Sequence, residues 1–446
     1  MRAPPSLDST AGSSFDISRL IDERAMSPLQ WLVAVACALS MFIDGYDLQV
    51  MALTVPSLTV EWATEPSRFA FALAAAPIGL GLAAAFLAPL GDRFGRRTML
   101  IAALLLGGLA TLATASATSP GQFVFWRLLT GMGIGISVPN CNAWTSEYAP
   151  ARGRATLLVL MNAAVGAGAV TAGFIAPAVL DNWGWRGTFL IGGTVPLLTA
   201  ALLYFLAPES LKFLLARRPN DARIASILRR IAPDVDPARL QRPDPAQPVP
   251  RASVVELLGP RFRARTLVLW GLVLVNLFTL YFLISWLPTI LQGAGWSIDD
   301  AVRGAVLIQA GGVIGGIVLS LFLNTGQTLP AMLTAFLLSA ACLALFHVVP
   351  SGAAWATMLT LIGAGVSGSQ LALNALSTAY YPPAIKATGM SWVGVIGTVG
   401  STLAPLAGGW IIATDVTPVN ILALLSIPAL LCAAGVLLTR MEWQAN

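Results

Sequence analysis

Long apolar runs separated by short polar segments are the main pattern along this chain. A run of about 20 apolar residues lets a helix cross a hydrocarbon core of roughly 30 Å. The runs predict twelve membrane-spanning helices, and therefore an all-α membrane protein. The predicted spans are 29–57, 67–90, 97–116, 121–142, 154–180, 186–207, 263–292, 300–323, 328–349, 352–379, 384–413 and 417–440.

The longest polar segment, residues 208–262, divides the spans six and six. Its Pro-rich, charged end is typical of a linker, and residues 221–231 within it predict a short surface helix. The first residues lack the basic start and short apolar run of a signal peptide, so they predict a tail. The predicted organisation is a cytoplasmic tail over 1–26, a six-helix bundle over 27–207, a cytoplasmic linker over 208–262, a second six-helix bundle over 263–440 and a cytoplasmic tail over 441–446.

The two halves also match in sequence. The segment GMGIGISVPNCNAWTSEYAPARGRAT (131–156) aligns without gaps with GAGVSGSQLALNALSTAYYPPAIKAT (363–388), at a constant offset of 232 residues. The identical pairs are Gly131/Gly363, Gly133/Gly365, Ser137/Ser369, Asn142/Asn374, Ala143/Ala375, Tyr148/Tyr380, Pro150/Pro382, Ala155/Ala387 and Thr156/Thr388. The match predicts two homologous, pseudo-symmetric bundles in parallel repeat.

Composition and charge agree with a membrane protein that crosses the bilayer many times. Apolar residues make up 56% of the chain and charged residues only 11%, whereas soluble domains carry about 25% charged residues. Lys and Arg gather in alternate loops, which predicts that both termini are cytoplasmic. We attribute the net charge of +5 to this topology rather than to nucleic-acid binding.

Cysteine and histidine indicate no metal site. The four cysteines fall within predicted spans at no metal-like spacing, so we predict that they are packing residues. The only histidine, His347, is predicted at the outer end of the ninth span, where an interfacial structural role is favoured over a proton relay.

Two carboxylates interrupt the first predicted span, in the stretch FIDGYDLQ. Asp44 and Asp47 are three residues apart and share one helical face. Each costs roughly 2.5–3.5 kcal/mol at the centre of a membrane helix, and such residues mark ion and substrate paths. Asp44 is predicted at a depth of roughly 22 Å from the inner surface.

Arg127, in the fourth predicted span, is the only Lys or Arg predicted deep inside a span. Its predicted depth nearly coincides with that of the two acids, so it can pair with Asp44, with Asp47 or with an anionic substrate. A purely structural ion pair is the alternative. Two acids facing one base leave a surplus carboxylate that desolvation favours in the protonated form, which suits a proton carrier.

The repeat predicts a polar lining for a cavity near the midplane between the halves. The offset brings Asn276 opposite Asp44, so the second half keeps a polar residue there without the charge. The aromatic residues below are predicted partners for a ring, although Trp and Tyr also populate membrane interfaces. The predicted polar residues are Asn142, Asn276, Gln309, Gln370 and Asn374, and the aromatic ones are Tyr281, Trp286 and Trp392.

The loop LGDRFGRRTM, residues 90–99, resembles the hallmark loop of the major facilitator superfamily, Gly-x-x-x-Asp-Arg-x-Gly-Arg-Arg, with Ala88 in place of the first Gly. Further stretches resemble the aromatic acid:proton symporter branch of that superfamily. They are DGYDLQ, RLLTGMGIGISVPN, SEYAPARGRAT, PESLKFLL and YPPAIKATGMSWVGVIGTVGS. Two departures are Thr398, where relatives often carry Arg, and the uncharged LFLNTGQT at the second-half counterpart of the loop.

The resemblance implies the major facilitator fold and proton-coupled import of an aromatic carboxylate across a bacterial-type inner membrane. It implies that Asp44 and Asp47 carry proton coupling, and that Arg127 mediates coupling or anchors the substrate carboxylate. Asp92, Arg96 and Glu147 would form a cytoplasmic gate. The proton gradient would drive transport without a cofactor, and we expect a monomer in the lipid bilayer.

Other functions remain as alternatives. Efflux of hydrophobic compounds is the main one, since the same fold also performs it, but two acids and one Arg at one depth favour a defined anion. A membrane enzyme is poorly supported because the chain has one His, no His/Cys cluster and no Gly-x-Ser-x-Gly motif. A receptor would not need two buried acids.

Overall fold

A computed structural model describes residues 17–235, 254–322, 327–346, 353–382, 385–414 and 416–444, and every regular element in these ranges is helical. His347 and parts of the predicted tails and linker lie outside them. The first half consists of α2 (Pro28–Glu61), η1 (Pro66–Phe69), α3 (Ala70–Phe86), η2 (Ala88–Leu90), α4 (Gly91–Phe94), α5 (Arg96–Ala115), α6 (Pro120–Tyr148) and α7 (Ala151–Leu206). The second half consists of α11 (Arg263–Gly293), α12 (Ile298–Ser320), α13 (Thr328–Leu345), α14 (Ala353–Tyr380), α15 (Lys386–Ile412), α16 (Pro418–Leu424) and α17 (Ser426–Gln444). Surface helices are α1 (Ile17–Asp22), α8 (Leu211–Arg217), α9 (Arg223–Ile231) and α10 (Val254–Leu257).

The helices account for the twelve predicted spans. Ten helices of the described ranges are long and apolar enough to cross a membrane. One of these is α7, which contains both the fifth and the sixth span and breaks at Gly184, where φ is 63°. The remaining span is α6, which is not among the ten helices. Its 29 residues include Arg127 and many other polar groups.

Close helix contacts at glycine confirm the internal repeat. A Cβ atom on Gly131 would lie 2.1 Å from the backbone oxygen of Ala76, and one on Gly363 would lie 2.0 Å from that of Ile308. These two contacts are related by the offset of 232 residues. Small residues let the backbones of membrane helices approach closely. The two halves therefore pack α3 on α6, and α12 on α14, in the same way.

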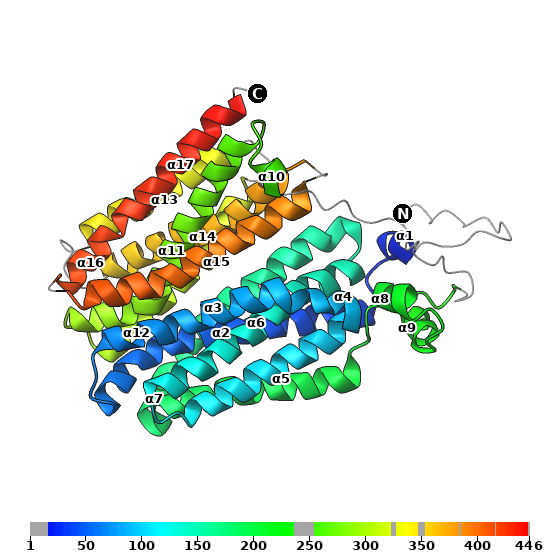
Figure 1. Cartoon of the computed structure of the whole chain (residues 1–446), viewed down its shortest axis with the longest axis horizontal. Helices are drawn as coiled ribbons and strands as arrows, with labels where there is room; N and C mark the ends of the chain where they lie inside the picture. Colours follow the sequence, from blue (N-terminus) through cyan, green and yellow to red (C-terminus); the bar gives the residue numbers. More distant parts are fainter. Residues whose placement is uncertain are drawn as a thin grey trace.

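Among the residues that the structure describes, the two halves share a core toward one end of the molecule. We call the end with the start of α2 and the end of α17 the terminal face, and the other end the opposite face. The core toward the opposite face contains residues of both halves, such as Val55, Phe69, Trp286 and Ile421, whereas the cores toward the terminal face each lie within one half. Figure 1 shows the two groups of helices meeting near the α12 and α16 labels and diverging toward the marked termini. The halves are therefore closed together on the opposite-face side.

An N-terminal segment fastens the surface helices to the first half. Helix α1 shares a core with α2, α8 and α9, although the sequence predicted only a tail at this point. Asp22 Oδ1 accepts from the Ala151 N–H at 2.7 Å, and the Arg24 guanidinium donates to both carboxylate oxygens of Asp234 at 2.5 Å. The Arg24 guanidinium lowers the pKa of Asp234. Surface helix α9 starts two residues after its predicted beginning, and α8 was not predicted.

Substituting the packing glycines tests the repeat. Gly131→Ala and Gly363→Ala should each lower the free energy of unfolding by about 1–3 kcal/mol, because the new methyl meets a backbone oxygen that cannot move aside. Gly271→Ala in α11 is the matched control, since no atom lies within 4 Å of its Cβ position. Thermal unfolding in detergent micelles measures the effect. Equal midpoints for all three variants would contradict the packing described.

Candidate coupling and gate sites

A buried ion pair joins α2 to α6. Arg127 Nη1 donates to Asp47 Oδ1 at 2.9 Å, and Arg127 Nη2 donates to Asp47 Oδ2 at 2.7 Å. The two side chains are 1% and 6% exposed. The Thr111 hydroxyl adds a third hydrogen bond to Asp47 at 3.2 Å, and the guanidinium lies 5.7 Å from the centre of the Phe189 ring. Every charge-bearing oxygen of Asp47 is thus paired in a fork geometry that suits Arg.

Asp44 lies one helical turn before this pair and is bonded very differently. Its side chain is buried, and its Oδ2 has no hydrogen-bond partner in the described part of the chain. The Ser137 hydroxyl of α6 lies beside the carboxyl group. A charge on Asp44 would be desolvated without a cation of its own, because Arg127 is already held by Asp47.

A small cavity lies between the two acids. Its volume is about 20 Å³, which is enough for about one water molecule. Helices α2, α5, α6 and α7 all contribute to its wall, so it lies inside the first half rather than between the halves. The polar residues that line it are Asp44, Asp47, Thr111, Thr130 and Ser137.

The predicted contact of Arg127 and Asp44 with the substrate stays a prediction. In this conformation both side chains are enclosed within the first half, beside a cavity of water size. Of the three partners that the sequence left open for Arg127, namely Asp44, Asp47 and an anionic substrate, the one it contacts in this structure is Asp47.

Four of the five predicted polar residues take part in hydrogen bonds between side-chain amides. In the second half, Asn276 Nδ2 donates to Gln370 Oε1 at 2.8 Å and to Val366 O at 3.2 Å, and Gln370 Nε2 donates to Asn374 Oδ1 at 3.2 Å. In the first half, Asn162 Nδ2 donates to Asn142 Oδ1 at 3.1 Å. Asn142 and Asn374 are equivalent in the repeat and both accept from an amide. Gln309 and Tyr281 are half-buried.

Two of the predicted aromatic partners, Trp286 and Trp392, pack against other groups of the second half. Trp286 is fully buried in the shared core, and its indole N–H donates to Pro405 O at 3.0 Å, so its role as a ring partner stays a prediction. Trp392 stacks on Trp270 with 5.7 Å between ring centres. It lies only six residues into α15, much closer to the terminal face than Asn276 is along α11.

Gln49 is a polar residue that the sequence reasoning missed. It is 2% exposed, and neither of its amide atoms has a hydrogen-bond partner within the described ranges. It shares a helical face with Gly45, which packs on α7, and with Leu53, which packs on α7 and on α12 of the other half. The amide therefore lies where the halves meet. Its place in DGYDLQ, two residues after Asp47, was the available signal.

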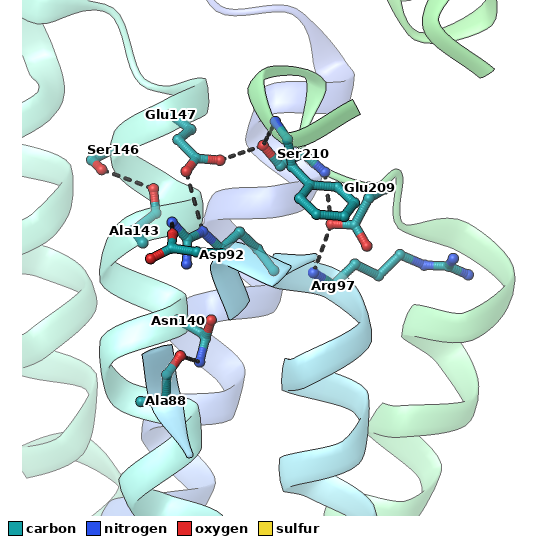
Figure 2. Close-up of polar contacts among 11 residues, drawn as sticks. Ala88, Asp92, Arg97, Asn140, Ala143, Ser146, Glu147, Glu209 and Ser210 are labelled. Atoms are coloured by element: carbon teal, nitrogen blue, oxygen red, sulfur yellow. Dashed lines mark hydrogen bonds and ion pairs between the residues drawn. The ribbon is translucent and has the colours of Figure 1, made fainter. Parts of the chain in front are cut away.

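The three predicted gate residues lie together at the terminal face. Arg96 forms ion pairs with Asp92 and with Glu147, the latter at 3.2 Å. Ser210, which precedes α8, donates its hydroxyl to Glu147 (Figure 2). The cluster therefore connects the loop between α3 and α5, the end of α6 and the start of α8.

Glu209 is a second residue that the sequence reasoning missed. It is buried, and its carboxylate accepts from the backbone N–H of Arg97 at 3.0 Å (Figure 2). It also accepts from the backbone N–H of Thr98 at 3.4 Å. A carboxylate at these first N–H groups stabilises the start of α5. A Cβ atom on Gly95, where φ is 104°, would lie 2.3 Å from Glu209. The PESLKFLL stretch contained this residue but gave no sign of its distant partner.

The fold and the buried acids are those of a membrane transporter built from two repeated halves. The chain belongs to the major facilitator superfamily, whose family model matches residues 37–405. The structure is similar to that of the xylose transporter XylE from E. coli in a partially occluded inward-open conformation. The TM-score is 0.70 at 20% identity, and the match covers 92% of this chain and 97% of that one.

Curated relatives of similar length are also named as transporters. A gallate transporter of Pseudomonas putida is 32% identical over 430 residues, covering 95% of this chain and 94% of the relative. The 4-hydroxybenzoate transporter PcaK of Acinetobacter baylyi is 32% identical over 435 residues, covering 96% of this chain and 94% of the relative. The chain is therefore a transporter rather than an enzyme.

Neutralising each acid separately should have unequal effects on stability. Asp47→Asn leaves Arg127 buried without a counter-charge and should lower the free energy of unfolding by about 3–5 kcal/mol. Asp44→Asn removes no ion pair and should change it by less than about 1 kcal/mol. Thermal unfolding of the purified variants measures the difference. A larger loss of unfolding free energy for Asp44→Asn than for Asp47→Asn would contradict the assignment of Asp47 as the partner of Arg127.

Proposed function

We propose that this protein imports an aromatic carboxylate together with protons across a bacterial-type inner membrane, with both termini in the cytoplasm. The names of the relatives, which include gallate, 4-hydroxybenzoate and benzoate, support the substrate class. The contrast between a fully paired Asp47 and an Asp44 with an unpartnered buried oxygen supports proton coupling. That contrast is the observation on which the proposal rests.

In this proposal Asp44 carries the transported proton, and the Asp47–Arg127 pair stays fixed as its neutral neighbour. A neutral carboxylic acid avoids the cost of a buried charge, and the water-sized cavity beside it supplies a first step for proton exchange. The proposal requires no cofactor, because the proton gradient drives transport. With the terminal face in the cytoplasm, the shared core seals the outer half, so this conformation is inward-facing.

The substrate site in this proposal lies between the halves near the midplane, where such folds bind their substrates. In this proposal the amide of Gln49 and the second N–H of Gln370 supply hydrogen-bond donors to a carboxylate and to ring hydroxyls, and Asn276 holds Gln370 in place. Tyr281 is half-buried on α11 and supplies an aromatic face. One chain contains both halves, so a monomer is a complete transport unit.

The alternative is proton-coupled efflux of hydrophobic compounds. A polar, amide-rich interface suits a defined carboxylate better than it suits a range of apolar compounds. Uptake assays separate the two, because an exporter would lower the cellular content of the labelled compound when the proton gradient is present.

Removing the titratable group from Asp44 should uncouple transport from the proton gradient. Cells with wild-type protein should concentrate a labelled hydroxybenzoate and lose that accumulation when a protonophore is added. Asp44→Asn should abolish accumulation yet keep exchange of internal for external substrate, since exchange needs no net proton movement. Asp181→Asn, an exposed acid at the bend of α7, is the control and should behave as wild type. Full accumulation by Asp44→Asn would overturn the assignment.

The gate cluster should control rate rather than affinity. Asp92→Asn removes one of the two acids that hold Arg96 and should slow uptake by roughly tenfold, as the loss of one charge-assisted hydrogen bond would. Substrate binding should change little, because the cluster is at the terminal face. Binding titration beside initial uptake rates tests this. A weakened affinity with unchanged turnover would contradict a gating role.

A further inference from the structure

An apolar groove opens between α12 and α13 in the second half, with α14 as its floor. Its volume is about 410 Å³, within the usual range of ligand pockets. No charged residue lines it. The lining residues are Gly315, Val318, Leu319, Phe322, Gln327, Pro330, Ala331, Thr334, Ala335, Leu338, Leu361, Ala364 and Gly365.

The same place in the first half is filled by side chains. Ala83, Met99, Ala103 and Ile136 form a buried cluster there, with Met132, Leu87, Leu90 and Leu106 packed against it. The offset of 232 residues relates seven of these eight residues to residues that line the groove.

The groove exists because large side chains have been replaced. Met99 corresponds to Ala331, and Met132 corresponds to Ala364. Ile136, a third large residue of the filled cluster, corresponds to a glycine at position 368. Unfilled space between well-packed helices normally costs stability. A second half that keeps such a space therefore gains from an occupant that fills it.

The groove faces the membrane. It runs along the part of α12 and α13 nearest the terminal face, and both helices are long and apolar enough to cross a bilayer. Val318 and Leu338 on its walls are 47% and 42% exposed, and Ile317 beside them is 59% exposed. Exposed apolar side chains at this depth contact hydrocarbon.

We propose that this groove binds an acyl chain of a phospholipid from the leaflet at the terminal face. The apolar walls match a hydrocarbon chain, and the polar side chains Gln327 and Thr334 lie toward the headgroup end. Only two of the lining side chains, Gln327 and Thr334, are polar, so a hydrocarbon chain fits the groove better than an aromatic carboxylate does. The site is separate from the coupling site, since α12, α13 and α14 belong to the second half.

Photo-crosslinking tests the proposal, with variants taken from the other half of the same chain. The protein is reconstituted in phosphatidylcholine vesicles that contain a small fraction of phosphatidylcholine with a diazirine on one acyl chain. Wild type should form lipid adducts on groove residues of α12 and α13. Ala331→Met with Ala364→Met copies the filled cluster and should lower these adducts by roughly tenfold, as expected when several buried methylenes are displaced.

The reverse variant is the matched control. Met99→Ala with Met132→Ala should create adducts between α3 and α5 that wild type lacks. The single variants Ala331→Met and Ala364→Met give the same readout if the double variant does not fold, and uptake confirms folding of each. Equal groove adducts in wild type and in the filled variants would overturn the proposal. So would crosslinks from the groove to a second copy of the chain in place of lipid.

Discussion

The bidentate ion pair between Asp47 and Arg127 is the constraint on which the chemistry of the first half depends. Two opposite charges are removed from water among α2, α5, α6 and α7, and two parallel hydrogen bonds pair them, while the buried Arg127 Nε has no partner in the described ranges. Removing one partner of a buried ion pair destabilises the fold more than the intact pair stabilises it, because the other charge is left buried alone. The pair therefore fixes α2 against α6 and leaves Asp44 without a cation. In our proposal, this is what makes Asp44 free to exchange a proton.

The repeat keeps the geometry of the two halves while their chemistry differs. Equivalent glycines set the same helix contacts, but Asn276 stands where the first half has Asp44. The charged groups of proton coupling and of the gate cluster are thus confined to the first half. The second half contributes amide hydrogen bonds and a membrane-facing groove. A parallel repeat whose halves move against each other can divide its tasks in this way.

The fold was predictable to a large extent because membrane spans are local patterns of apolar residues, and the repeat is a local match in sequence. The partner of Arg127 was predictable only as one of two acids or an anionic substrate, since both acids lie on one helical face. The capping of α5 by Glu209 was not predictable, because its partners lie more than a hundred residues away. The burial of Trp286 likewise depends on Pro405 of a different helix. Such contacts arise from tertiary packing, which periodicity does not encode.

Infrared spectroscopy of the purified protein tests the central claim most directly. A protonated carboxylic acid in an apolar site has a carbonyl stretching band that an ionised, paired carboxylate lacks. The account predicts such a band in wild type near neutral pH, its loss in Asp44→Asn, and its retention in Asp181→Asn, the exposed-acid control. A band that persists unchanged in Asp44→Asn would show that the proton resides on a group other than Asp44, and would contradict the account.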